Sequence, residues 1–550
     1  MPTISRQAGL RYEETGTYAP MMESLETRMY LSGVDFVEGK LVYQDSVGST
    51  VTVTLKGGGS GVANFPGEAI NNANPSLVIV PASDKCTLTI TVKGTDRKAK
   101  NVTTIITGLT VTDEAKLDDA ALKSIKAAAV TLSGNLTMNA VGATITLGNL
   151  TNGADVLLSG ASEKAVTTLT LGQVGANSDI LAAGLPLALS AKRIGTSFTI
   201  HRNNHLSALY LTKITVAGLL NVNTLVAAGT DAKGVSIGSL TVGSRLFADV
   251  TVPGRVNSVI VGDAYTGTFR AESVGTITTK GFTDPIADQT YDGDWYPDLV
   301  LSGTGAKGVS IGTIKAAGNF HGHIDVPGRI NRIAVADGMF RYMQGATLTI
   351  KAESIGSITA RHLGTKLEAG DGDITDGYIA LQIGSDAKGV SIGSIKLYSL
   401  FRGNLGATGR VNRLTFGGAH SGSFEAASIG TLTITGYTAY TGKKYDGYLE
   451  SSITLSGVGV KQGKNTLGSA KIFGKMTSPI TITGNVGTIT VNRVGAFLFI
   501  SGKAKSIKTL DKLELAVAGG AGHIQVQGGG KVIANNGKFT ISGTERLYVI

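Results

Sequence analysis

The sequence has little of what holds many exported or membrane proteins together. Of its 550 residues one is a cysteine, Cys86, which excludes an intrachain disulfide. No apolar run reaches the roughly 18 residues that a membrane-spanning helix needs, so we expect no membrane span. Proline accounts for 11 residues and aromatic residues for 6%. Low proline without a three-residue glycine period excludes collagen and argues against disorder.

Charge and catalytic signatures are equally sparse. The net charge of +10 is mild for this length, so it fits either a solvated basic surface or an acidic partner such as an anionic glycan. Basic residues do not alternate with aromatic residues, which argues against a nucleic-acid partner. No Gly-x-Ser-x-Gly nucleophile motif occurs, and acidic residues are concentrated outside the strand-like segments. We therefore expect no enzyme activity and no cofactor.

Glycine, by contrast, is abundant, with 76 residues, and it belongs to a recurring signature. The signature is an aliphatic residue, Gly or Asn, a small or polar residue, and a second aliphatic residue. We expect the Gly or Asn to tolerate a positive φ at a corner of the chain. The first aliphatic residues of the clearest copies are Ile237, Val256, Val274, Ile311, Ile330, Ile355, Ile392, Val411, Ile429 and Val486.

The spacing of these copies predicts the fold class. From Ile237 to Ile429 the steps are 19, 18, 37, 19, 25, 37, 19 and 18 residues. A short fixed period indicates stacked units that bury a continuous core, and alternating Val, Ile, Thr and Leu favour strands. The pattern predicts an all-β protein, a parallel β-solenoid of about 18–20 residues per coil. We expect Ile311, Ile330, Ile355, Ile392 and Val411 to point inward in one column.

A longer repeat lies over the short one. Residues 232–238 return as 306–312 and 387–393, at offsets of 74 and 81 residues, so large repeats occupy about 232–460. Residues 34–100 are strand-like without the signature, and we interpret them as an N-terminal β cap. The solenoid is then expected over 101–550, with residues 1–33 as a separate N-terminal segment.

That segment contains Leu25-Glu26-Thr27-Arg28-Met29-Tyr30-Leu31-Ser32. It resembles the LEPR-XLL domain family of large exported or surface-associated bacterial β-repeat proteins. Leu25, Glu26, Arg28, Leu31 and Ser32 match the family pattern, whereas Thr27 and Tyr30 depart from it. The resemblance implies a sorting segment and therefore an exported protein at the cell surface or in the extracellular space.

Two sets of residues are candidates for glycan contact. Aromatic rings in or beside the insertions between repeats are suited to stacking on sugars: Trp295, Tyr296, Tyr378 and Tyr448. They occupy related points of successive repeats, so we expect their loops on one side of the molecule. Arg255, Arg329 and Arg410 each precede the first aliphatic residue of a signature, as does Arg193. If the units stack in register, these guanidinium groups form a basic stripe.

Metal binding has weaker signals. Asp371, Asp373 and Asp376 place three carboxylates within six residues, but position six of a calcium loop is normally Gly and no Glu follows at position twelve. His321 and His323 share one strand face, without an evident third ligand. The sequence thus predicts a non-catalytic structural or adhesin-like protein. The alternative is a carbohydrate-binding or polysaccharide-degrading protein on the same fold.

Overall fold

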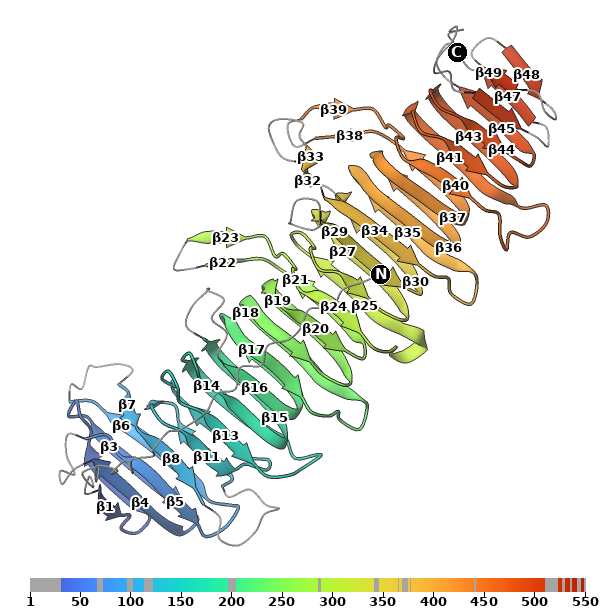
Figure 1. Cartoon of the computed structure of the whole chain (residues 1–550). Coiled ribbons are helices and arrows are strands. Elements are labelled where there is room, and N and C mark those ends of the chain that lie inside the picture. Colours follow the sequence, from blue (N-terminus) through green and yellow to red (C-terminus); the bar gives the residue numbers. More distant parts are fainter. Residues whose placement is uncertain are drawn as a thin grey trace, which may run out of the picture.

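A computed structural model describes residues 31–66, 73–95, 102–112, 122–195, 204–284, 288–340, 346–364, 366–367, 374–375, 377–439, 442–509, 523–526, 530–534, 537–541 and 546–548. Within these residues the protein is all-β. One sheet contains 41 strands, most of them paired in parallel, and four further sheets have two strands each. The only helical element of the described chain is a 3-10 turn at Ala306–Gly308. Figure 1 shows an elongated stack of strands.

The stack is built from three ladders of parallel pairs. The first ladder contains the signature residues and has a regular register, as in Ile311 with Ile330 and Ile330 with Ile355. Its strands, in order, are β9 (Ser124–Ala127), β12 (Thr144–Leu147), β14 (Thr167–Val174), β15 (Ile180–Ile194), β16 (His205–Val216), β18 (Val235–Thr251), β19 (Arg255–Thr266), β21 (Val274–Thr279), β25 (Val309–Ala316), β27 (Arg329–Val335), β30 (Ser354–Ala360), β35 (Val390–Leu397), β36 (Leu400–Phe416), β37 (Gly418–Ile434), β41 (Asn465–Met476), β43 (Asn485–Val494), β45 (Ala504–Thr509) and β47 (Gly530–Ala534).

The second ladder runs beside it. The longest strands, such as β18 and β36, bend and contribute to more than one ladder. The remaining strands of the second ladder are β5 (Ser76–Pro81), β8 (Gly108–Val111), β11 (Leu136–Asn139), β13 (Val156–Ser159), β17 (Leu220–Ala227), β20 (Thr268–Ala271), β24 (Asp298–Leu301), β26 (Ile324–Asp325), β29 (Thr347–Ala352), β34 (Tyr378–Ile383), β40 (Ser452–Leu455), β42 (Ile480–Ile482), β44 (Leu498–Ile500) and β46 (His523–Val526).

The third ladder is narrow and often only one residue wide. It includes the short strands β7 (Thr104–Ile106), β10 (Val130–Leu132), β28 (Gly338–Met339) and β31 (His362–Leu363). Elsewhere it consists of strand ends and single bridges. Its central residues, each paired with the next, are Leu246, Ala264, Trp295, Phe320, Met339, Leu363, Phe401, Ala419, Leu449 and Met476.

The core lies between the ladders. Successive side chains of a regular strand point to opposite faces, so two aliphatic residues three positions apart would not share a face. Both are nevertheless buried, as at Ile311 and Ile314, because the alternation is interrupted at the two residues between them. Ile311, Ile330, Ile355, Ile392 and Val411 are paired in sequence and at most 1% exposed. The predicted inward column is therefore confirmed.

The glycine of the signature has a different role from the expected one. Gly275, Gly312, Gly356 and Gly393 lie inside strands and are not among the residues with positive φ. A Cβ at Gly312 would lie 2.3 Å from the carbonyl oxygen of Gly275, and one at Gly393 would lie 2.2 Å from that of Gly356. The expectation of a positive φ was wrong; at these glycines the close approach of neighbouring strands excludes a side chain. Positive φ occurs instead at Gly234, with φ 73°.

Antiparallel pairs lie at both ends of the described stack. At one end β1 (Leu31–Asp35) pairs with β4 (Gly59–Pro66), and β2 (Lys40–Gln44) pairs with β3 (Thr50–Lys56), in the region of the predicted β cap. β3 also pairs with β6 (Thr87–Lys93), which leads into the first ladder. At the other end are β48 (Gly537–Ile541) and β49 (Arg546–Tyr548). Such pairs cover strand edges that would otherwise be open to other chains.

Three hairpins project from the same side of the stack in Figure 1. They are β22 (Phe282–Asp284) with β23 (Gln289–Tyr291), β32 (Lys366–Leu367) with β33 (Ile374–Thr375), and β38 (Tyr437–Thr438) with β39 (Lys444–Tyr445). The first and third lead from the first ladder into the third ladder. No helix in the described residues is long and apolar enough to span a membrane.

Candidate functional site

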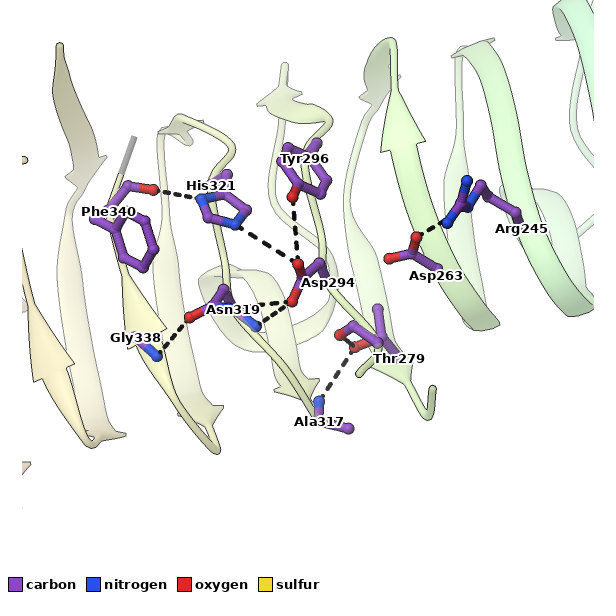
Figure 2. Close-up of polar contacts among 11 residues, drawn as sticks. Arg245, Asp263, Thr279, Asp294, Tyr296, Ala317, Asn319, His321, Gly338 and Phe340 are labelled. Atoms are coloured by element: carbon purple, nitrogen blue, oxygen red, sulfur yellow. Dashed lines mark hydrogen bonds and ion pairs between the residues drawn. The ribbon is translucent and has the colours of Figure 1, made fainter. Parts of the chain in front are cut away.

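The outer face of the third ladder gathers the ionisable side chains (Figure 2). We call the segment that one turn of the chain contributes to the third ladder a rung. Where the central residue of a rung is buried, its two neighbours in sequence point away from the core. Around Trp295 these neighbours are Asp294 and Tyr296, and around Ala264 they include Asp263. Charged and aromatic groups from successive rungs are thereby brought together.

Asp294 is the centre of one cluster. Its Oδ1 accepts hydrogen bonds from the backbone amide of Asn319 at 2.6 Å and from Asn319 Nδ2 at 3.3 Å, and its Oδ2 accepts one from the Tyr296 hydroxyl at 3.3 Å. Nε2 of His321 lies 3.9 Å from Oδ2. Burial alone would raise the pKa of Asp294, but its contacts with His321, Asn319 and Tyr296 outweigh burial and lower it.

His321 and Thr279 hold this cluster to its neighbours. His321 is 3% exposed, and its Nδ1 lies 2.8 Å from the carbonyl oxygen of Phe340 on the next rung. The buried Thr279 hydroxyl donates to the carbonyl of Gly293 and accepts a hydrogen bond from the amide of Ala317. The contacts with Ala317 and Phe340 join neighbouring turns of the chain, and the contact with Gly293 closes the base of the β22–β23 hairpin. The cluster thereby fixes the rungs relative to one another.

Arg245 and Asp263 form a second, buried cluster. Their side chains are 10% and 5% exposed, with Nε of Arg245 3.1 Å from Oδ2 of Asp263. Burial raises the pKa of Asp263 to about 6; the guanidinium opposes this shift, and the charge of Asp294 adds to it. The guanidinium carbon also lies 4.0 Å from the ring centre of Tyr291 and 5.8 Å from that of Phe282, within reach of cation–π attraction.

Aromatic rings continue along the same face. Tyr296 and His321 are stacked with centroids 4.3 Å apart, and His321 meets Phe340 edge-on at 4.8 Å. Further contacts of 5.3–5.7 Å extend the row in both directions. In order, the row consists of Phe247, Tyr265, Tyr296, His321, Phe340 and His362.

The two carboxylates have pKa values displaced in opposite directions, which is the pattern of an acid–base pair. Both are nevertheless engaged by the protein itself, Asp263 with Arg245 and Asp294 with Asn319 and Tyr296. The arrangement is suited to bracing the stack.

The structure corrects the expected glycan contacts. Trp295 is 0% exposed and donates its indole N–H to the carbonyl of Pro297 at 2.8 Å, so its ring is part of the core and cannot stack on a sugar. Tyr296 lies against His321. Tyr378 begins a second-ladder strand and donates to Asn404, so it is not equivalent to Trp295. Tyr448, 40% exposed, is the one of the four that presents an open ring.

The predicted arginine stripe is present with wide gaps. Arg255, Arg329 and Arg410 occupy corresponding ends of β19, β27 and β36. Two strands separate each from the next, which spaces them by about 14 Å at ordinary strand separation. Arg193 does not belong to this row, because its neighbour Ile194 pairs with Leu220 toward the third ladder.

Several predicted residues lie outside the described part of the chain. These are Leu25, Glu26 and Arg28 of the sorting motif and the calcium candidates Asp371, Asp373 and Asp376. Leu31 and Ser32 are in the backbone of β1. Among the described residues no group of three or more His, Cys, Asp or Glu residues is arranged to hold a metal ion.

The buried pair of Arg245 and Asp263 was not predicted from the sequence, because the acidic residues were placed outside the strands. Asp263 stands inside β19, directly after the apolar and small residues 259–262. A signal was present: a charged residue directly before a buried third-ladder position, in Arg245-Leu246 and again in Asp263-Ala264.

A groove on the second ladder was also missed. It has a volume of about 650 Å³ and crosses β34, β36, β37 and β40. Most of its lining is apolar, and Glu425 is the only carboxylate among the lining residues. These residues are Gln382, Ile383, Gly384, Gly406, Ala407, Thr408, Glu425, Ala426, Ala427, Thr454, Ser456 and Val458.

No protein-family model, curated protein or solved structure matches the chain.

Proposed function

We propose that the chain is a parallel β-solenoid that acts as an exported, non-catalytic structural or adhesin-like protein of the cell surface. Three ladders of parallel pairs in continuous register support the solenoid, because each turn of chain contributes once to each ladder. A stack of this kind can extend by adding units without changing its cross-section. It is suited to spanning distance rather than enclosing a substrate.

One observation carries the non-catalytic part of the proposal. The two carboxylates with displaced pKa values, Asp263 and Asp294, are engaged by other groups of the protein. Arg245 and Asn319 reach them from neighbouring rungs, and Tyr296 reaches Asp294 from its own rung. General acid–base catalysis needs such groups within reach of a substrate proton. Here they take the place of apolar packing on the face where the hairpins attach.

The export part of the proposal rests on the LEPR-XLL-like segment that ends at Ser32. It is tested by cell fractionation of the producing bacterium with an antibody against the full chain. A variant lacking residues 1–30 spares β1, which pairs with β4, so its fold should persist while its surface pool is lost. A cytosolic pool of the intact chain, or surface delivery of the shortened one, would contradict the proposal.

A second candidate function, glycan binding, is favoured by the groove on the second ladder. The groove runs across several rungs, as a polymer-binding site would, yet Glu425 provides one carboxylate where glycoside hydrolysis requires a pair. We expect retention of glycans without turnover. The test is a screen of purified protein on acidic and neutral glycans, with Glu425→Gln and Thr454→Ala as groove variants that should weaken retention and the exposed Tyr398→Ala as a variant outside the groove that should not.

A further inference from the structure

The molecule contains two versions of one hairpin on the third ladder. β22–β23 and β38–β39 both follow a first-ladder strand, with Phe282 eight residues after Val274 and Tyr437 eight residues after Ile429. The paired rings are stacked alike, Phe282 on Tyr291 at 4.7 Å and Tyr437 on Tyr445 at 5.0 Å. The two hairpins are therefore structurally equivalent.

In the first version the chain supplies its own ligand. The Arg245 guanidinium lies beneath Phe282 and Tyr291 and pairs with Asp263 on the adjacent rung. This is a box for a planar cation, with aromatic walls and one carboxylate. Figure 2 shows the arginine and carboxylate of this box side by side.

In the second version the internal cation and its carboxylate are replaced. Leu400 pairs with Gly418 in the third ladder at the positions where Arg245 pairs with Asp263 beneath the first hairpin. An uncharged side chain thus replaces the arginine, and a glycine replaces the aspartate. A cavity of about 160 Å³ lies there, lined by Leu400, Gly418, Ala419, His420, Tyr437, Tyr448 and Glu450.

The walls of this cavity keep the chemistry of the box. Tyr437 and Tyr448 provide ring faces, and Glu450, which takes the position of Tyr296, provides a carboxylate that is hydrogen-bonded to His420. Burial and the nearby Tyr445, Tyr448 and Glu450 raise the pKa of Tyr437 to about 12, so its hydroxyl stays protonated at neutral pH. Guanidinium groups stack on aromatic rings and bind carboxylates through paired N–H donors.

We propose that the cavity beneath β38–β39 is a binding site for a guanidinium group from outside the chain, the arginine side chain of a partner protein. The choice of ligand is motivated by the equivalent box, which the molecule fills with Arg245. Two residues that line the cavity are open to solvent: Tyr448 is 40% exposed as a residue, and the side chain of His420 is 41% exposed. An incoming side chain therefore has access. This inference does not depend on export or on the groove of the second ladder.

The test measures binding to the full-length protein by calorimetry and ligand-observed NMR. The probes are methylguanidinium, methylammonium, and the peptides Gly-Arg-Gly and Gly-Lys-Gly. We expect saturable millimolar binding of methylguanidinium, at least tenfold tighter binding of the arginine peptide, and at least tenfold weaker binding of each lysine-like counterpart. Equal binding of methylguanidinium and the arginine peptide would overturn the assignment to a protein partner.

Variants of the box complete the test. Glu450→Gln and Tyr437→Ala should each weaken binding at least tenfold, whereas Asp446→Asn, an exposed change on the same hairpin, should leave it unchanged. The double variant Leu400→Arg/Gly418→Asp recreates the pair of the first box and should abolish binding while the protein remains folded. Binding that survives in the folded double variant, or no binding by the unaltered protein, would overturn the proposal.

Discussion

The first and third ladders are built by the same chain with the same period, yet they are occupied differently. The inward positions of the first ladder are aliphatic at every large repeat, from Ile311 to Val411. Those of the third ladder range from Ala264 to Trp295 and Phe320. In a broad ladder of closely spaced strands, the core admits only a narrow range of side-chain volumes. In a ladder one residue wide, beside insertions, the volume of the inward side chain can vary more.

The outer faces differ in the same way. Strand neighbours approach closely in the first ladder, so glycine is required at positions such as Gly312 and Gly393. On the third ladder the hairpins cover the outer face and leave space for long side chains, which pair with one another there. The comparison indicates that the first ladder sets the period and the third ladder accommodates the differences between repeats. Four changes test it, in order of expected effect.

Trp295→Ala should cause the largest loss, about 3–5 kcal/mol of unfolding free energy, because it removes the largest buried side chain of the third ladder. Urea unfolding followed by far-UV circular dichroism measures the loss. Tyr398→Ala, at a residue 59% exposed, is the control and should change stability by less than about 0.5 kcal/mol. Equal effects at the two positions would show that Trp295 is not part of the core.

Ile355→Ala should cost about 2–5 kcal/mol, because it leaves a cavity in the middle of the aliphatic column between Ile330 and Ile392. Fluorescence of Trp295, the single tryptophan, reports unfolding of the neighbouring rungs. The exposed Arg332 on the adjacent strand provides a matched alanine control. A loss below about 1 kcal/mol would mean that the column does not bear on stability.

Gly393→Ala should destabilise by about 1–3 kcal/mol, because the new methyl group would lie 2.2 Å from the carbonyl oxygen of Gly356 and would push two strands apart. The matched change is Asn412→Ala, at the position of the signature where a side chain is already accommodated. It should be nearly neutral in the same denaturation assay. A neutral Gly393→Ala would refute close approach as the reason for the glycine.

The smallest effect concerns pH. The pKa of Asp263 is about 6 in the folded protein and near 3.9 in an unfolded chain, so between these values the folded state binds more protons. Stability should therefore rise by about 1 kcal/mol as the pH falls from 7 to 5. Asp263→Asn should remove this rise, and Asp292→Asn, at an exposed residue, should retain it. An unchanged pH profile in Asp263→Asn would place the titration elsewhere.

Much of the fold could be predicted because the repeat of about 18–20 residues is formed by aliphatic side chains that must be buried. The aliphatic column of the first ladder followed from spacing alone. The site was harder. Arg245 and Asp263 are 18 residues apart and become neighbours only because their rungs are adjacent, so their pairing depends on the register of the stack.

The sequence by itself determined the all-β class, the length of the repeat unit and the inward column, because a fixed spacing of Val, Ile and Leu leaves one arrangement that keeps them from water. Tertiary structure decided the rest. Burial turned Trp295 from a candidate sugar platform into core, and pairing across rungs assigned Asp263 to Arg245. Arg245 and Leu400 can be compared only because stacking places both residues beneath equivalent hairpins. Contacts between rungs depend on the register of the whole stack, which no local sequence pattern specifies.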